Sequence, residues 1–188
     1  MSLFLHICAG LGLALAAGIR PFTPAWVAGA FAGAGVLYDF HGTHFAFLQS
    51  GAFLIAVVAL FIVSVFVRGR ELRDLVATGG IALGGLLFAA MLAAHHDAAW
   101  PGLVGGVLAA TLAQVATRPI FSRAAERLTD GAARFAVTLY ADAVALLLAA
   151  ACWFAGPLSL VALALLARLA WAERRRLAAQ FAGLRVLR

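Results

Sequence analysis

The sequence predicts an all-α membrane protein with about seven transmembrane helices, and two observations carry this prediction. First, 65% of the 188 residues are apolar and only 12% are charged, whereas soluble domains average about 45–50% and about 25%. Second, the chain has no lysine, and its 14 arginines gather between long apolar runs, as they do in the cytoplasmic loops of membrane proteins. This composition excludes a water-soluble enzyme, a disordered tail and a nucleic-acid-binding domain, despite the net charge of +6.

Seven apolar stretches are candidates for these helices, since a spanning helix needs about 20 mostly apolar residues. The stretches are 2–19, 22–38, 47–67, 75–94, 98–117, 135–155 and 157–172. Gly156 and Pro157 divide the last two, because the uninterrupted run would be too long for one span. The stretch 22–38 is short, so a re-entrant or interfacial piece is the alternative there.

The arginines also predict the orientation of the chain. With seven spans, the connections at 20, 68–73, 118–134 and 174–176 all fall on one face of the membrane. The other face receives residues 39–46, 95–97 and Gly156, which include no arginine. The positive-inside rule then places the N-terminus outside and the C-terminus in the cytoplasm.

Two segments outside the spans are amphipathic. Residues 119–134 place Ile120 and Ala124 near one face and charged residues around the rest, which predicts a cytoplasmic helix on the membrane surface. Residues 174–188 form a basic tail, and anionic lipid stabilises each arginine there by about 1 kcal/mol. The predicted organisation is a transmembrane bundle over 1–173, which contains the 119–134 helix, and a cytoplasmic tail, with membrane lipids as partners. A solvated basic segment without a specific partner is the alternative for both segments.

Small residues that recur every four positions predict close packing of helices. In lipid such seams let two backbones approach, and dispersion then holds the helices together. They indicate a compact bundle and say nothing about chemistry. The recurring sets are Gly10, Ala14 and Gly18; Gly29 and Gly33; Gly80 and Gly84; and Gly102, Gly106 and Ala110.

Two similar helix ends suggest an internal repeat. Arg20-Pro21 closes the first predicted helix, and Arg118-Pro119 closes the fifth. With seven spans this predicts a 3+1+3 plan, in which helices 1–3 and 5–7 are parallel repeats and helix 4 links them. Transporters with parallel repeats bind substrate near the repeat interface.

Four blocks of the chain resemble a known family. They are GLGLALAAGIRPFTP at 10–24, WPGLVGG at 100–106, YADAVAL at 140–146 and FAGLRVLR at 181–188. In this order they are similar to the bacterial membrane proteins described as domain of unknown function 4126. The resemblance spans nearly the whole chain. It implies a helical fold in the inner (cytoplasmic) membrane of a bacterium, and it brings no activity with it.

Asp142 is the leading candidate for a functional residue. It lies about 10 Å into the sixth predicted helix, where a carboxylate costs about 2.5–3.5 kcal/mol and should face the bundle interior or a water-filled cavity. Arg20 and Arg118 are its candidate partners. Two interpretations stay open, a structural ion pair that clamps two helices and a site for a substrate or a proton. The predicted path for a solute or ion consists of Asp142, Arg118, Arg20, Tyr140, Thr138 and Gln114.

Four prolines are predicted to mark helix breaks, since proline ends a helix and biases its predecessor away from helical geometry. The arginines that precede two of them have two open interpretations. Either they reach phosphate head groups at the membrane surface, or they converge on an anionic substrate through paired hydrogen bonds. The predicted breaks are Pro21, Pro24, Pro119 and Pro157.

The outer face carries a candidate metal site. Four of the five histidines lie there, and imidazole with carboxylate suits zinc, nickel or iron. The alternative is that these polar residues only bound the spans; no cofactor is predicted. The fifth histidine, His6, is expected to pack within its helix. The candidate ligands are Asp39, His41, His44, His95, His96 and Asp97.

These features together predict a small-solute transporter or permease that forms a homo-oligomer, with its path between the two halves of the chain. A channel is the first alternative, and a non-transporting scaffold or lipid-binding protein is the second. An enzyme is not expected, because the sequence has no nucleophile–base pair, phosphate loop or HExxH pattern. Nucleic acid is not an expected partner.

Overall fold

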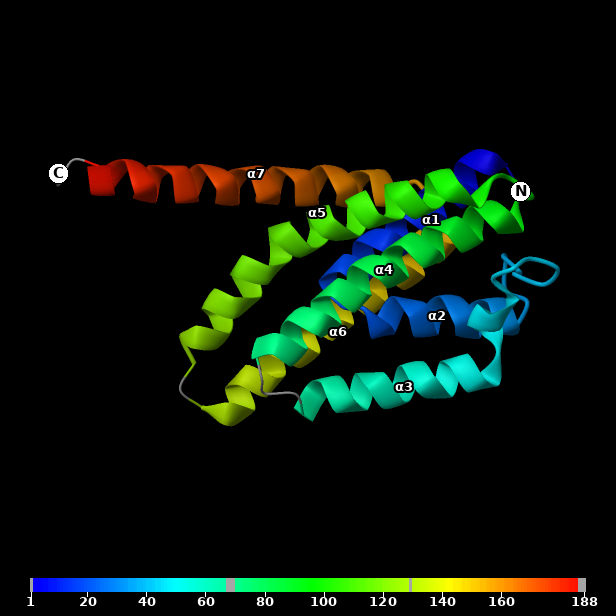
Figure 1. Ribbon diagram of the computed structural model, residues 1–188, viewed down its shortest axis with the longest axis horizontal. Coiled ribbons are helices and arrows are strands. Elements are labelled where there is room, and N and C mark those ends of the chain that lie inside the picture. Colours follow the sequence, from blue (N-terminus) through cyan, green and yellow to red (C-terminus); the bar gives the residue numbers. More distant parts are fainter. Residues whose placement is uncertain (1, 67–69, 129, 186–188) are drawn as a thin grey trace.

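The structure is a computed structural model that describes residues 2–66, 70–128 and 130–185. Within these ranges the chain forms seven α-helices and one short 3-10 helix and contains no strand, which confirms the all-α prediction. Figure 1 shows the helices as a tilted bundle. In chain order they are α1 (Leu3–Ile19), α2 (Phe22–Gly33), the 3-10 helix η1 (Ala46–Gln49), α3 (Gly51–Phe66), α4 (Arg70–Ala94), α5 (Ala99–Glu126), α6 (Gly131–Phe154) and α7 (Leu158–Arg185).

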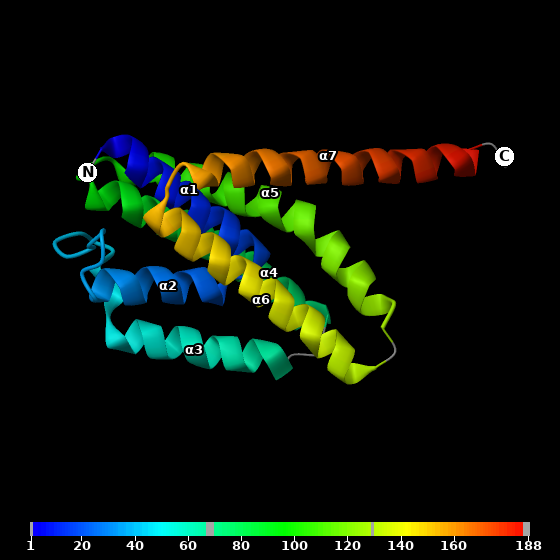
Figure 2. The ribbon, with the colours of Figure 1, turned by 180° about the vertical axis from the view of Figure 1, so that it is seen from behind.

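The helices run back and forth along the long axis of the molecule. The N-terminus, the loop after α2 and the turns after α4 and α6 lie at one end (Figure 1). The turns after α1 and α5 and the C-terminal part of α7 lie toward the opposite end, as the view from behind also shows (Figure 2). The alternation therefore brings the arginine-bearing segments near Arg20 and at 118–127 to the same side of the bundle.

Among the residues that the structure describes, three helical segments are long and apolar enough to cross a membrane, judged by length and composition. They are Asp74–Ala94 within α4, the whole of α5 and the whole of α6. α1 and residues Gly51–Ser64 of α3 are apolar but shorter. α2 has 12 residues and is about 18 Å long, far below the ~30 Å of a hydrocarbon core. The helix predicted over 22–38 is therefore shorter than expected, since it ends at Gly33.

α1 lies inside the bundle, where it packs against α4, α5 and α6. Glycines permit this approach. A Cβ on Gly18 would collide with the carbonyl oxygen of Ala110 in α5, and a Cβ on Gly84 of α4 would lie 2.7 Å from the Cβ of Ala110. Gly106 likewise faces the backbone of Gly84. The predicted seams of α1, α4 and α5 are thus confirmed as the places where these helices touch.

The outer surface of the bundle is rich in large apolar side chains. α3 shows this most clearly, because it packs mainly against α2 and η1 and leaves Ile55, Leu60, Ile62 and Val63 each more than half exposed. Apolar surface of this extent marks contact with a membrane or with another protein. Together with the three long apolar segments, it is the surface of a membrane protein.

Two of the four predicted helix breaks occur. Pro21 follows the end of α1, and Pro157 lies between α6 and α7. Pro24 instead lies in the first turn of α2, where a missing N–H leaves no helical hydrogen bond unmade. Pro119 lies inside α5, which continues to Glu126. The prediction of breaks at Pro24 and Pro119 is therefore wrong.

The two segments predicted to lie outside the spans are continuations of long helices. Residues 119–126 belong to α5 and residues 131–134 to α6, so a separate amphipathic helix over 119–134 is not formed. Asp130 caps α6, since its carboxylate accepts a hydrogen bond from the backbone N–H of Ala132 at 3.1 Å. α7 similarly runs on past residue 173 to Arg185, so the bundle and the tail share one helix.

Candidate functional site

A cavity of about 730 Å³ lies at the arginine-rich end of the bundle. α1 ends at Ile19, just after Gly18 contacts Ala110 of α5, whereas α5 continues from Ala110 to Glu126, a further ~24 Å. The cavity lies beyond the α1–α2 turn, between the helices that extend past it. Its lining consists of residues 17–21 of the α1–α2 turn, Ser64 of α3, Val76 and Ala77 of α4, Gln114, Thr117, Arg118, Phe121, Ser122, Ala125 and Glu126 of α5, and Thr138 and Ala141 of α6.

Arg20 lies where α1 ends against the cavity. Its backbone is extended (φ −145°, ψ 121°), as expected for a residue before proline. Its Nη2 donates a hydrogen bond to the carbonyl oxygen of Thr138 at 3.2 Å, and its Nε lies 3.2 Å from Oδ1 of Asp142. Thr138 and Asp142 are four residues apart and share one face of α6. Arg20 therefore ties the α1–α2 turn to α6.

Arg118 has a different partner from the one considered in the sequence. Its Nη2 donates a hydrogen bond to Oδ1 of Asp74, on α4. Both side chains are about half exposed, so this ion pair lies at the solvent-accessible edge of the cavity. Asp142 is paired with Arg20, and the alternative pairing of Asp142 with Arg118 is wrong.

The predicted path residues divide into three groups. Arg20, Arg118, Gln114 and Thr138 line the cavity. Asp142 lies behind Arg20 and is only 9% exposed. Tyr140 is 66% exposed and is not among the lining residues, because two residues along a helix turn the side chain by about 200°. Tyr140 therefore lies outside this cavity.

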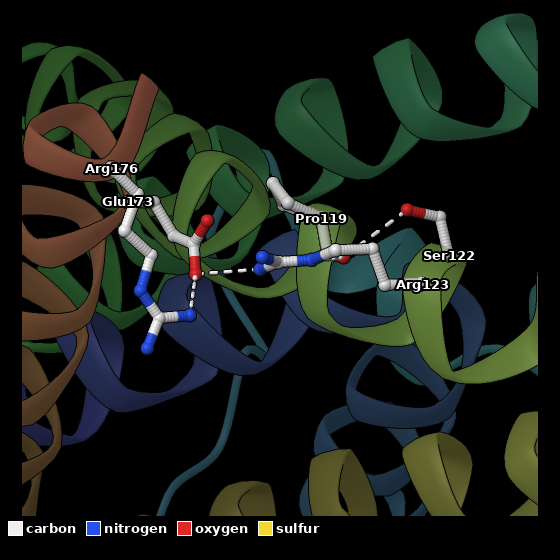
Figure 3. Close-up of polar contacts among 5 residues, drawn as sticks. All are labelled: Pro119, Ser122, Arg123, Glu173 and Arg176. Carbon is white, nitrogen blue, oxygen red and sulfur yellow. Dashed lines mark hydrogen bonds and ion pairs between the residues drawn. The ribbon is translucent and has the colours of Figure 1, made fainter. Parts of the chain in front are cut away.

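Pro119 and its neighbours connect the cavity wall to α7 (Figure 3). The carbonyl oxygen of Pro119 accepts hydrogen bonds from Arg123 Nε at 2.8 Å and from Ser122 Oγ at 3.2 Å. Nη2 of Arg123 also lies 2.6 Å from Oε1 of Glu173, and Nη1 of Arg176 lies 3.4 Å from the same oxygen. Glu173 is 9% exposed. The part of α5 beyond Pro119 is thus fixed to α7, a contact that the sequence pattern did not predict.

The polar residues of the loop after α2 and of the turn after α4 do not assemble into a metal site. Nδ1 of His95 lies 2.8 Å from Oδ2 of Asp97, and Nε2 of His41 lies 3.9 Å from Oδ1 of Asp39. Each is a local pair of residues two apart in sequence. In the part of the chain that the structure describes, no three His, Cys, Asp or Glu side chains come together to hold a metal ion. The prediction of a metal site at Asp39, His41, His44, His95, His96 and Asp97 is wrong.

Aromatic side chains gather instead at the end of the bundle where the N-terminus lies (Figure 1). The ring of His6 lies 4.8 Å from that of His95 and 4.9 Å from that of Tyr38, centroid to centroid. Tyr38 also meets Trp153 edge to face at 5.0 Å, and the indole N–H of Trp153 donates to the carbonyl oxygen of Val36 at 2.9 Å. Burial raises the pKa of Tyr38 above its ordinary value, so its hydroxyl stays protonated. This cluster packs α1 and α6 against the loop that follows α2.

These features define a helical protein of the membrane type, with a polar cavity at its arginine-rich end and tight packing at its other end. A family model, the domain of unknown function DUF4126, matches residues 7–176. Since this is most of the 188 residues, the chain belongs to that family, as the resemblance of its sequence blocks implied. The comparisons with curated proteins and with solved structures gave no match.

Proposed function

We propose that the protein is a small-solute transporter of the bacterial inner membrane and that the cavity holds the solute at the cytoplasmic end. The carrying observation is the cavity itself, which is lined by arginine, glutamine and threonine side chains. Its volume of about 730 Å³ falls within the ~300–1,000 Å³ typical of small-molecule sites. The positive-inside rule assigns the arginine-rich end to the cytoplasm.

The packing at the inner end of the cavity favours a transporter over a channel. α1, α4 and α5 touch at Gly18, Gly84 and Ala110 with no room for a methyl group, and this seam adjoins the cavity. A transporter presents its site to one side of the membrane at a time, whereas an open channel needs a continuous path. A scaffold or lipid-binding protein, the other alternative, would use Asp142 only to hold Arg20 against α6 and has no evident use for the polar cavity beside that pair.

The internal repeat fits the proposed path. Arg20 and Arg118 occupy the same place in the two proposed repeats, and both line the cavity, although only the first Arg-Pro pair ends its helix. A site at the interface of parallel repeats is typical of several transporter folds. The exposed apolar face of α3 is proposed to contact membrane lipids and a second copy of the chain. The proposal involves no enzymatic step, cofactor or nucleic acid.

Uptake into proteoliposomes tests the proposal. The uptake should be saturable, and a thiol reagent that reaches the cavity should block it. Gln114 lines the cavity and Val115 faces outward at 43% exposure, while the native Cys8 and Cys152 are buried. A charged methanethiosulfonate reagent should therefore block uptake of a panel of labelled small metabolites by the Gln114→Cys variant and spare the matched Val115→Cys variant. Uptake that rises linearly with solute concentration would favour a channel, and absence of uptake across the panel would favour a scaffold.

The orientation leads to a separate expected result. His41 in the loop after α2 and Arg127 in the turn after α5 are both exposed, and these two connections lie at opposite ends of the bundle (Figure 1). In intact cells an impermeant maleimide should label the His41→Cys variant at once, and it should label the Arg127→Cys variant only after permeabilisation. Labelling of both variants from the same side would contradict the alternating arrangement across the membrane.

A further inference from the structure

We propose that the solute is a small organic anion and that Arg20 binds its carboxylate or phosphate group. This inference rests on the proposed transport function and names the chemical class of its substrate. It depends on Arg20 being exposed to the cavity while its partner Asp142 is not. It also depends on the N–H groups of Arg20 that its contacts within the protein leave available to a ligand.

A ligand in the cavity meets the cation before the anion of the Arg20–Asp142 pair. The side chain of Arg20 is 29% exposed, whereas that of Asp142 is 11% exposed. Arg20 lines the cavity, and Asp142 is absent from its lining. Although the pair is neutral as a whole, the nearer group decides the potential at the cavity surface. An arginine cannot lose its charge at accessible pH, so this potential persists.

Arg20 is oriented for such a ligand. A guanidinium has five N–H donors, and contacts with Thr138 and Asp142 account for one on Nη2 and the one on Nε. These two contacts fix the plane of the group, so less side-chain entropy is lost when an anion binds to the remaining donors. Asp142 is therefore a positioning residue. Gln114 and Thr117, which also line the cavity, supply polar groups for the rest of the ligand.

The other charged lining residues do not reverse this preference. Arg118 is paired with Asp74 at the exposed edge, so together they add no net charge. Glu126 is exposed at the C-terminal end of α5, where water and salt screen its carboxylate. The bound anion is thus attracted chiefly by Arg20 and opposed chiefly by Asp142.

Thermal unfolding of the full chain in detergent tests this inference. The probe is sodium succinate or inorganic phosphate, and the reference is sodium chloride at equal ionic strength. A ligand that binds only the folded state raises the unfolding temperature, so at least one probe should give a saturable shift. In the Asp142→Asn variant the half-saturating concentration should fall about tenfold, because the asparagine keeps the oxygen that accepts from Nε of Arg20 while the charge that opposes the anion is removed. The Arg20→Gln/Asp142→Asn double variant, which leaves no unpaired charge, should lose the shift. The control variant is Arg127→Gln, at an exposed position outside the cavity lining, and it should keep the half-saturating probe concentration of the wild type.

Three outcomes would overturn the inference. The first is that neither probe raises the unfolding temperature more than sodium chloride does. The second is that the wild type and the Asp142→Asn variant have the same half-saturating probe concentration, and the third is that the double variant keeps the shift. A shift with succinate alone or with phosphate alone supports it and decides between the two anionic groups. Binding and transport fail separately in these experiments. Saturable uptake of a neutral solute without an anion-induced shift would overturn anion binding and support the transport function. An anion-induced shift without any uptake would support anion binding and overturn the transport function.

Discussion

The Arg20→Gln variant is expected to lose about 3–5 kcal/mol of unfolding free energy, because removing one partner of a buried ion pair leaves the other charge uncompensated. The charge left behind is the carboxylate of Asp142, whose side chain is only 11% exposed. The variant also loses the hydrogen bond to the carbonyl oxygen of Thr138. Denaturant unfolding in detergent micelles, followed by circular dichroism, measures the loss.

The reciprocal change provides the control for this prediction. Asp142→Asn leaves Arg20 without its partner, but Arg20 borders the cavity and can be hydrated there. We expect the Asp142→Asn variant to lose clearly less stability than the Arg20→Gln variant, and the double variant to recover most of the larger loss. Equal losses in the two single variants would mean that the cavity does not hydrate Arg20.

Replacing Gly18 with leucine is expected to cost at least about 3 kcal/mol, at the upper end of what overpacking costs in protein interiors. A Cβ at this position meets the backbone of Ala110, and backbone cannot move aside as a flexible side chain can. Gly79→Leu in α4 is the matched control, since a Cβ there has no neighbour within 4 Å. The control should unfold like the wild type, and a Gly18→Leu variant of wild-type stability would contradict the close α1–α5 contact.

The alternation of the helices was predictable because it follows from local properties of the sequence. The length of each apolar run, the arginines in the connections, and the prolines at 21 and 157 can each be read from one continuous stretch of the sequence. The same holds for the seams of Gly18, Gly84 and Gly106, since small side chains are what closely packed helices in lipid require.

Contacts between helices were less accessible, because they depend on how far one helix is shifted along another. Asp142 was recognised as a residue that needs a partner, but Arg20 and Arg118 satisfied that condition equally in the sequence. Asp74, which pairs with Arg118, lies just before the predicted span over 75–94, and nothing in the sequence marked it as a partner. The position of Tyr140 outside the cavity was foreseeable, since helical rotation alone separates its side chain from that of Asp142.

The histidines and Pro119 show two further limits of the sequence pattern. Histidine gathered on one face of a membrane fits both metal binding and aromatic packing, and the choice depends on distances between loops. Proline inside a helix removes only the hydrogen bond that its own N–H would donate to the carbonyl oxygen four residues earlier. α5 keeps its helical course past Pro119 to Glu126 without that bond.

The ion pair between Arg123 and Glu173 has a mechanical consequence. α5 is least stiff at Pro119, which has no N–H to donate, and the residues beyond it form one wall of the cavity. Arg123 fixes those residues to α7, which is 28 residues long, about 42 Å, and begins at the corner formed by Gly156 and Pro157. A rotation of α7 about that corner would carry Glu173 and the attached Arg123 on an arm of ~23 Å, the length of helix from Leu158 to Glu173, and would thereby change the width of the cavity mouth.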